Sequence, residues 1–323
     1  MNRHATPTAL PAVDAPRAKF ADPDLTARGE TRASVPLIGL ETLWFNTGTL
    51  CNIECLRCYI ESSPSNDRLV YLTAEEVARY LDEAQALGAP LREVAFTGGE
   101  PFLNPEMIAM AEAALTRGHD VLILTNAMKP MMRPRMRDGL ADLIARHGDR
   151  LTLRVSLDHH AAPHHDEERG AGAFAVSLIG MRWLRDAGAR MAVAGRTIWG
   201  EDDNTSRAGY AALFAREGLA IDAADPGMTV LFPEMDERAD PPEITTDCWG
   251  ILGKSPATVM CASSRMVVKR KGAARPSVAA CTLLPYAPEF DLGETLAEAS
   301  RPVKLNHPHC ATFCVLGGGS CSG

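Results

Sequence analysis

The sequence predicts an α/β protein in which short apolar strands alternate with amphipathic helices around a parallel sheet. The first observation behind this prediction is a repeated strand–helix order between about residue 41 and residue 233. The second is a hydrophobic content of 46% in a chain of 323 residues, which suffices for a sizeable buried core. The third is that several polar motifs follow directly after strands, where the carboxyl edge of a parallel sheet places functional groups.

Hydrophobic periodicity and capping residues define six strands and five helices. The predicted strands span residues 41–48, 92–99, 120–127, 150–158, 189–199 and 228–233. The predicted helices span residues 72–88, 105–118, 134–148, 172–188 and 206–218. Thr73 and Glu76 have the spacing of a capping box at the start of the first helix. Six units fall short of the eight that close a TIM barrel, so a partial barrel or an open sheet is expected.

The pattern changes at both ends of this alternation. Residues 1–36 are polar and rich in Pro and Ala, and we expect a disordered extension there. Residues 37–236 hold the strand–helix units and form the predicted core domain. Residues 237–323 are loop-rich and cysteine-rich, with a hairpin expected over residues 264–281, and they form a small predicted C-terminal extension.

Charge and hydropathy limit the function classes. Lys and Arg total 33 against 41 Asp and Glu, and the resulting net charge of −8 argues against general binding of nucleic acids. No apolar run is long enough for a transmembrane helix, and the N-terminal residues lack the apolar segment of a secretory signal. We therefore expect a cytoplasmic protein with no membrane partner.

The nine cysteines fall into two groups. The first group is Cys51, Cys55 and Cys58. The second group lies near the end of the chain and consists of Cys248, Cys261, Cys281, Cys310, Cys314 and Cys321. Because the number is odd and no export signal is present, metal or cluster ligation is favoured over disulfides. The two groups indicate two separate metal-binding regions.

The early cysteines have the spacing Cys-x3-Cys-x2-Cys on the loop after the first strand. Three thiolates can hold three irons of a [4Fe–4S] cluster and leave the fourth iron open for a small molecule. The alternatives are a zinc ion that takes a distant fourth ligand and a set of buried free cysteines.

A glycine-rich turn, TGGEP at residues 97–101, follows the second strand. Its two glycines allow the backbone to approach a ligand closely. Glu100 could pair with an ammonium group. Taken alone, the same residues are more typical of an ordinary turn.

Together these two motifs resemble the radical S-adenosylmethionine (radical SAM) family, over roughly residues 41–235. The resemblance implies a partial (β/α)6 barrel and a [4Fe–4S] cluster on Cys51, Cys55 and Cys58. It also implies that the amino and carboxylate groups of SAM chelate the open iron. The implied SAM contacts are Gly98, Gly99, Glu100, Pro101, Thr125, Asn126, Ser156, Asp158 and Arg196. For Ser156 and Asn126 the alternative is an ordinary polar group at the end of a strand.

Arg57 departs from the family pattern. The family usually has an aromatic residue before the third cysteine, near the adenine, whereas here the aromatic Tyr59 comes one residue after it. The Arg57 guanidinium could stack on the adenine instead.

Residues 158–170, DHHAAPHHDEERG, carry four histidines after the fourth strand. They could hold a metal or supply a general base, with His159 and His160 nearest to the expected site. We favour a solvated loop in which His165, Asp166 and Arg169 make local bonds.

The late cysteines resemble the twitch or SPASM-type extensions of radical SAM enzymes, which bind auxiliary [4Fe–4S] clusters. The resemblance implies one auxiliary cluster, because two complete ones would need eight cysteines. Its expected ligands are Cys261, Cys281, Cys310 and Cys314, with Cys321 as the substitute. A zinc site with four thiolates is the alternative.

The implied activity is the reductive cleavage of SAM to a 5′-deoxyadenosyl radical that abstracts hydrogen from a substrate. An external one-electron reductant of the flavodoxin or ferredoxin type would supply the electron. The substrate is expected to be a small metabolite or a peptide, and the lack of a recognisable peptide-binding domain mildly favours the metabolite. No side chain is assigned a catalytic role. A non-catalytic iron–sulfur or zinc-binding protein is the alternative from another class.

Overall fold

The structure is a computed structural model that describes residues 18–234, 236 and 240–318. The strands of its central sheet are β2 (Thr42–Asn46), β3 (Glu93–Thr97), β4 (Asp120–Thr125), β5 (Leu151–Ser156), β6 (Arg190–Arg196), β7 (Thr229–Phe232), β8 (Ser264–Val268) and β9 (Ser277–Ala279). The α-helices are α1 (Ala74–Ala86), α2 (Met107–Thr116), α3 (Pro134–His147), α4 (Ala162–Arg169), α5 (Ala173–Asp186), α6 (Asp203–Glu217) and α7 (Cys248–Leu252).

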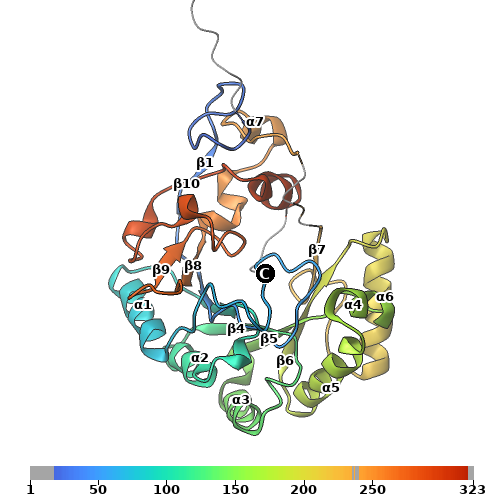
Figure 1. Cartoon of the computed structure of the whole chain (residues 1–323). Helices are drawn as coiled ribbons and strands as arrows, with labels where there is room; N and C mark the ends of the chain where they lie inside the picture. The colour runs from blue at the N-terminus through green and yellow to red at the C-terminus, as the bar shows by residue number, and fades with distance from the viewer. Residues whose placement is uncertain (1–17, 235, 237–239, 319–323) are drawn as a thin grey trace, which may run out of the picture.

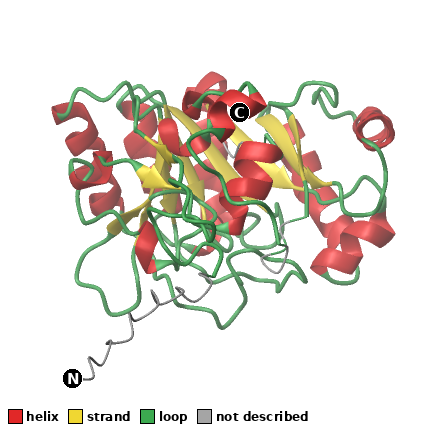
Figure 2. Ribbon diagram, turned by 90° about the horizontal axis from the view of Figure 1, so that it is seen from above, coloured by secondary structure: helices red, strands yellow, loops and turns green. Residues whose placement is uncertain are grey.

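The eight strands form one sheet in the order β7-β6-β5-β4-β3-β2-β8-β9. Strands β2 to β7 are parallel to their neighbours, as the strand–helix alternation predicts. Helices α1 to α6 follow the outside of the curved sheet (Figure 1), and the view from above shows strands with helices around them (Figure 2). The predicted α/β class and the partial barrel of six strand–helix units are confirmed.

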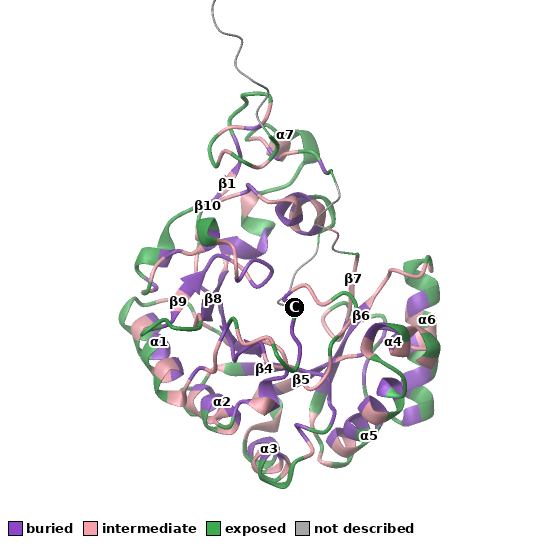
Figure 3. Cartoon of the chain, viewed as in Figure 1, coloured by how far each residue is buried: buried purple, intermediate pink, exposed green. Residues whose placement is uncertain are grey.

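Alternating side chains of β2, β3, β4, β8 and β9 belong to two different cores. On β2, Leu43 and Phe45 belong to the large core that lies between the sheet and the helices. The intervening Trp44 belongs to a smaller cluster inside the curve, together with Leu122 and Met266. Figure 3 shows these strands as buried and the outer faces of the helices as exposed. This two-residue period leaves little of any central strand in contact with water.

The predicted hairpin near residue 270 is present, and it extends the barrel sheet. Strand β8 runs parallel to β2, with Met266 opposite Trp44, and β9 then pairs with β8 in the antiparallel direction. The large core likewise includes Cys261 and Phe313 from the C-terminal segment. The C-terminal segment therefore shares both a sheet and a core with the strand–helix units.

The predicted disorder of residues 1–36 is wrong for residues 18–36. The Arg32 side chain is buried and its Nη2 lies 2.6 Å from Glu243 Oε1. Strand β1 (Ser34–Val35) pairs with β10 (Val303–Lys304). The buried ion pair and the strand pairing hold residues 18–36 against the rest of the fold. The polar composition of this segment does not predict such contacts. Residues 1–17 lie outside the described residues.

The histidine-rich segment is also not the solvated loop that we expected. Residues 162–169 form helix α4, and its His165 and Glu168 are buried. Pro163 occupies the first turn of this helix, where the lack of an N–H costs nothing. Among the helices of the described ranges, none is long and apolar enough to cross a membrane.

Candidate functional site

The carboxyl ends of the parallel strands meet at one edge of the sheet, where a cavity of about 370 Å³ opens. Its volume lies in the range of small-molecule sites. The barrel side of the lining includes Arg57, Cys58, Thr97, Ser156, Asp158, Arg169 and Arg196. The opposite side is built by the C-terminal segment and includes Thr282, Leu283, His309 and Phe313. The cavity thus joins four of the predicted site residues to residues that the sequence did not indicate.

The two glycines of the TGGEP turn are required by close packing against the cysteine loop. Gly98 has a φ of +143°, and a Cβ there would lie 2.5 Å from Gly48 O. A Cβ at Gly99 would lie 2.2 Å from Leu50 O. The amide of Gly99 donates to Gly48 O over 2.9 Å. This turn therefore sets the position of the loop that begins with Cys51.

The Glu100 carboxylate holds two strand ends together. Its Oε1 accepts hydrogen bonds from Thr125 Oγ1 at 2.9 Å and from the Phe102 amide at 3.2 Å. Its Oε2 accepts from the Asn126 amide at 2.8 Å. Burial raises the pKa of Glu100 to about 7, although these hydrogen bonds oppose the rise. These contacts occupy the carboxylate that we expected to face an ammonium group, and they give Glu100 a positioning role.

Asn126 lies against the cysteine loop. Its Nδ2 donates to Asn52 Oδ1 at 2.9 Å and lies 4.0 Å from Cys51 Sγ. Burial raises the pKa of Cys51 to about 12, and the charges of Glu100, Cys55 and Cys58 add to the rise. Ligation of these thiols therefore has to displace protons.

Asp158 is held by two arginines. Arg169 donates to it from Nε at 2.6 Å and from Nη2 at 3.0 Å, and Arg196 Nε lies 3.4 Å away. Burial alone would raise the pKa of Asp158, but Arg169 and Arg196 outweigh it and lower the pKa. Arg169 also lowers the pKa of Cys55, which burial raises. Sequence reasoning placed Arg169 in a loop with local bonds and missed it as part of this site.

Arg57 contacts a buried carboxylate. Its Nη1 pairs with Glu168 of α4, and its Nε lies 3.7 Å from Glu234. The Arg57 carbonyl accepts a hydrogen bond from Arg196 Nη2 at 2.9 Å. The residue that departs from the family pattern therefore ties the cysteine loop to α4 and to the end of β6.

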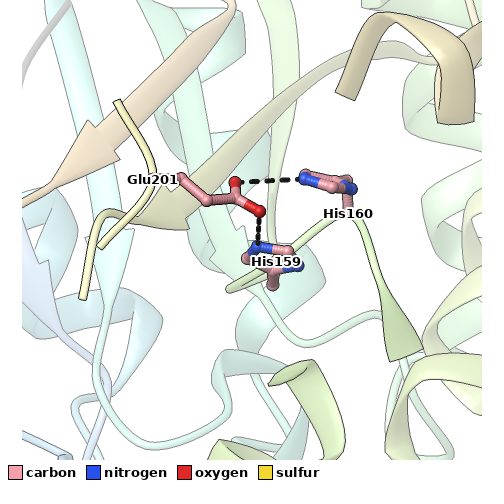
Figure 4. Close-up of side chains that lie close together, drawn as sticks. All are labelled: His159, His160 and Glu201. Carbon is pink, nitrogen blue, oxygen red and sulfur yellow. Dashed lines mark hydrogen bonds and ion pairs between the residues drawn. The ribbon is translucent and has the colours of Figure 1, made fainter. Parts of the chain in front are cut away.

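His159, His160 and Glu201 lie together beside this edge (Figure 4). Glu201 Oε1 is 3.3 Å from His159 Nε2, and Oε2 is 3.2 Å from His160 Nε2. The Ala161 amide donates to His159 Nδ1 at 3.0 Å, so a neutral ring carries its proton on Nε2. A metal-ligating nitrogen must be unprotonated. The arrangement therefore favours a polar contact between two loops, in which His160 is hydrogen-bonded to Glu201, over a metal site.

The four predicted late ligands belong to one core: Cys261 and Cys310 are buried in it, and Cys281 and Cys314 pack against it. Burial raises the pKa of Cys310 well above its usual value. Cys314 lies on the same π-helical segment as Cys310, Cys310–Leu316. Cys248 instead accepts a hydrogen bond from the Thr245 amide at 3.3 Å. The predicted substitute, Cys321, lies outside the described residues.

The chain is similar to known proteins in sequence and in fold. Residues 45–204, just under half of the chain, match the Radical SAM superfamily. An AdoMet-dependent heme synthase of Methanosarcina barkeri is 31% identical over 138 residues, or 42% of this chain and 37% of that protein. The antilisterial bacteriocin subtilosin biosynthesis protein AlbA of Bacillus subtilis is 28% identical over 171 residues, or 53% of this chain and 35% of that protein. The chain spans little more than a third of the length of these relatives.

Solved structures share the fold at low identity. Streptococcus suis SuiB bound to S-adenosylmethionine has a TM-score of 0.56 and 12% identity, over 79% of this chain and 63% of that one. The protein anSMEcpe with bound AdoMet has a TM-score of 0.56 and 14% identity, over 80% and 79% of the two chains. The fold is therefore of the partial-barrel kind that these proteins share.

Proposed function

From the match of residues 45–204 to the Radical SAM superfamily, we propose that this segment is a radical SAM domain and that the protein is an enzyme that cleaves SAM reductively. The observation that carries the proposal is the contact between the cysteine loop and the TGGEP turn. Their backbones are joined by the hydrogen bonds Gly99 N to Gly48 O and Glu100 N to Leu50 O. The turn would thus present its backbone to the methionine end of SAM beside the cluster.

The chemistry of the donors supports a cluster over a single zinc ion. A tetrahedral zinc holds its sulfurs roughly 3.8 Å apart, given a Zn–S bond of about 2.3 Å. Within the described part of the chain, the one set of three ligand atoms that lie within 4.8 Å of one another is that of His159, His160 and Glu201. Among the described cysteines, therefore, no three sulfurs lie as close together as a single zinc ion requires, and we propose that the larger cluster is what each group binds.

Each residue has a proposed task. Cys51, Cys55 and Cys58 hold a [4Fe–4S] cluster with an open iron, and Cys261, Cys281, Cys310 and Cys314 hold one auxiliary cluster. When bound, the first cluster and SAM together supply a 5′-deoxyadenosyl radical that removes hydrogen from the substrate. The part of the site that would bind SAM consists of Gly98 to Pro101, Thr125, Asn126 and Ser156. Within it, the Glu100 carboxylate fixes the positions of Thr125 and Asn126. Asp158, fixed by Arg169, offers a carboxylate to the ribose or the amine, while Arg196 offers a cation to the SAM carboxylate.

The substrate occupies the part of the cavity that the C-terminal segment closes. The stacked rings of Phe232 and Phe313, with centroids 5.7 Å apart, join the end of β7 to that segment. This wall excludes water from the radical. A ferredoxin or flavodoxin would deliver the electron, and the substrate is a small metabolite or a peptide segment.

The proposal is tested by incubation of the anaerobically reconstituted protein with SAM and dithionite. Formation of 5′-deoxyadenosine is the expected result. A protein that only stores iron–sulfur clusters or zinc would leave SAM intact, and that result would overturn the proposal.

A further inference from the structure

Among the described residues, Arg265 is a buried cation without a carboxylate partner. It lies on β8 and is 1% exposed. Its guanidinium donates to four backbone carbonyls, namely Ala299 O at 2.9 Å, Cys261 O at 2.5 Å, Ser264 O at 2.7 Å and Arg301 O at 3.3 Å. Within the described ranges, no carboxylate oxygen lies within 4.0 Å of it.

Arg32 is a second buried arginine of this region, and it differs from Arg265 because it has a carboxylate partner. It is also 1% exposed, and its guanidinium likewise donates to backbone carbonyls. In addition, its Nη2 lies 2.6 Å from the buried Glu243 carboxylate. Because an isolated buried charge is costly, the lack of such an anion at Arg265 calls for another source of negative charge.

Two of the proposed cluster ligands lie next to Arg265 in the fold. Cys261 precedes it by four residues and gives it a carbonyl oxygen, and Cys281 follows the paired strand β9. Both thiols carry negative charge once they bind a metal.

We propose that Arg265 is the counter-charge of the auxiliary cluster and raises the reduction potential of that cluster. The inference rests on the proposed auxiliary cluster on Cys261, Cys281, Cys310 and Cys314. A cluster with four thiolates is anionic, and one-electron reduction adds a further negative charge. A fixed cation in a buried site stabilises the reduced form more than the oxidised form.

The test isolates the auxiliary cluster in a Cys51→Ala/Cys55→Ala/Cys58→Ala background. Arg265→Gln and Arg265→Lys are reconstituted there, and their potentials are measured by an EPR-monitored dithionite titration. The control is Arg270→Gln, which removes a cation just after the end of the same strand. Unlike Arg265, Arg270 has a carboxylate partner, because its Nη1 lies 2.5 Å from Asp291 Oδ2. We expect a more negative potential for Arg265→Gln, and values close to the parent for Arg265→Lys and Arg270→Gln.

An unchanged potential in Arg265→Gln would overturn the inference. If Arg265→Gln takes up no iron while Arg265→Lys does, the cluster requires the positive charge; a potential of Arg265→Lys close to the parent then supports the inference, and a clearly shifted one overturns it. If both variants take up no iron, assembly of the cluster depends on the hydrogen bonds of the guanidinium to the four carbonyls rather than on its charge. Arg265 then has a structural role only. If the parent of this series binds no iron at all, the auxiliary cluster itself is refuted, while SAM cleavage by the unmodified protein remains a separate result.

Discussion

Arg169 donates two hydrogen bonds to Asp158, from Nε at 2.6 Å and from Nη2 at 3.0 Å. Asp158 follows β5, and Arg169 is the last residue of α4. The side chains are 4% and 11% exposed, so both charges are withdrawn from water. Because Arg169 also acts on the pKa of Cys55, this pair connects the edge of the sheet to the cysteine loop.

Arg169→Gln should destabilise the apo-protein by about 3 kcal/mol, since it leaves the buried Asp158 carboxylate without its main partner. Arg196, at 3.4 Å from Asp158, limits the loss. The free energy of unfolding in urea at pH 7 measures the effect. Arg137→Gln, which removes one member of an exposed pair with Asp138, should cost less than about 1 kcal/mol. Equal losses in the two variants would contradict the role of Arg169.

Glu100 should make the protein less stable as the pH rises. Its pKa is about 7 in the folded protein and about 4.5 when unfolded, so the folded chain keeps a proton that the unfolded chain releases. Its contribution is fully present below pH 4.5 and is lost by about pH 7, and it is of the order of 3 kcal/mol. His165, whose pKa burial lowers to about 4, acts in the opposite direction, so the difference between wild type and Glu100→Gln is the quantity to measure.

The stability of wild type relative to Glu100→Gln should therefore fall between pH 4.5 and pH 7. Urea denaturation at several pH values gives this difference. Glu75→Gln, in the first turn of α1, is the control and should follow the wild-type profile. A constant difference between wild type and Glu100→Gln would show that Glu100 titrates normally.

Gly99→Ala should displace the cysteine loop, because its Cβ would lie 2.2 Å from Leu50 O. We expect a loss of about 3 kcal/mol in stability and a lower iron content after reconstitution. Gly148→Ala is the matched control, since Gly148 has a φ of −50° and nothing within 4 Å of an added Cβ. That change should be neutral or stabilise the protein by about 0.5 kcal/mol. Normal iron loading in Gly99→Ala would refute the packing argument.

Arg57 and Glu168 should be energetically coupled. Their side chains are 38% and 0% exposed, so Arg57→Ala leaves a buried carboxylate without its cation. A double-mutant cycle with Glu168→Gln should give a coupling of about 1 to 3 kcal/mol, in which the second change recovers part of the first loss. Strictly additive losses would show that the pair contributes nothing and would restore the alternative of an Arg57 that serves a bound ligand.

The regular elements were predictable because their signals are local. The capping box of Thr73 and Glu76 is present as the sequence indicated, with Thr73 Oγ1 accepting from the Glu76 amide at 3.1 Å. Helix α4 was missed because its buried face consists of His165 and Glu168 rather than apolar side chains. Its burial depends on pairing with distant groups such as Arg57, which no local pattern shows.

The sequence predicted which strand ends form the site, but not the contacts that the side chains make there. Parallel strands bring Gly99, Asn126 and Asp158 to one edge whatever the side chains do there. The use of the Glu100 carboxylate depends on Thr125, 25 residues later, and could not be derived from the turn. The pairing of β8 with β2 could not be derived either, because it joins residues more than 200 positions apart. The sequence therefore predicted the hairpin but not the strand that it pairs with.

The most direct measurement counts iron and 5′-deoxyadenosine in the reconstituted wild type and in a Cys51→Ala/Cys55→Ala/Cys58→Ala variant. We predict about eight irons per chain in the wild type, as two [4Fe–4S] clusters require, with SAM cleavage under dithionite. The variant should keep about four irons and form no 5′-deoxyadenosine. SAM cleavage that persists in the variant would contradict the assignment of these three cysteines to the catalytic cluster.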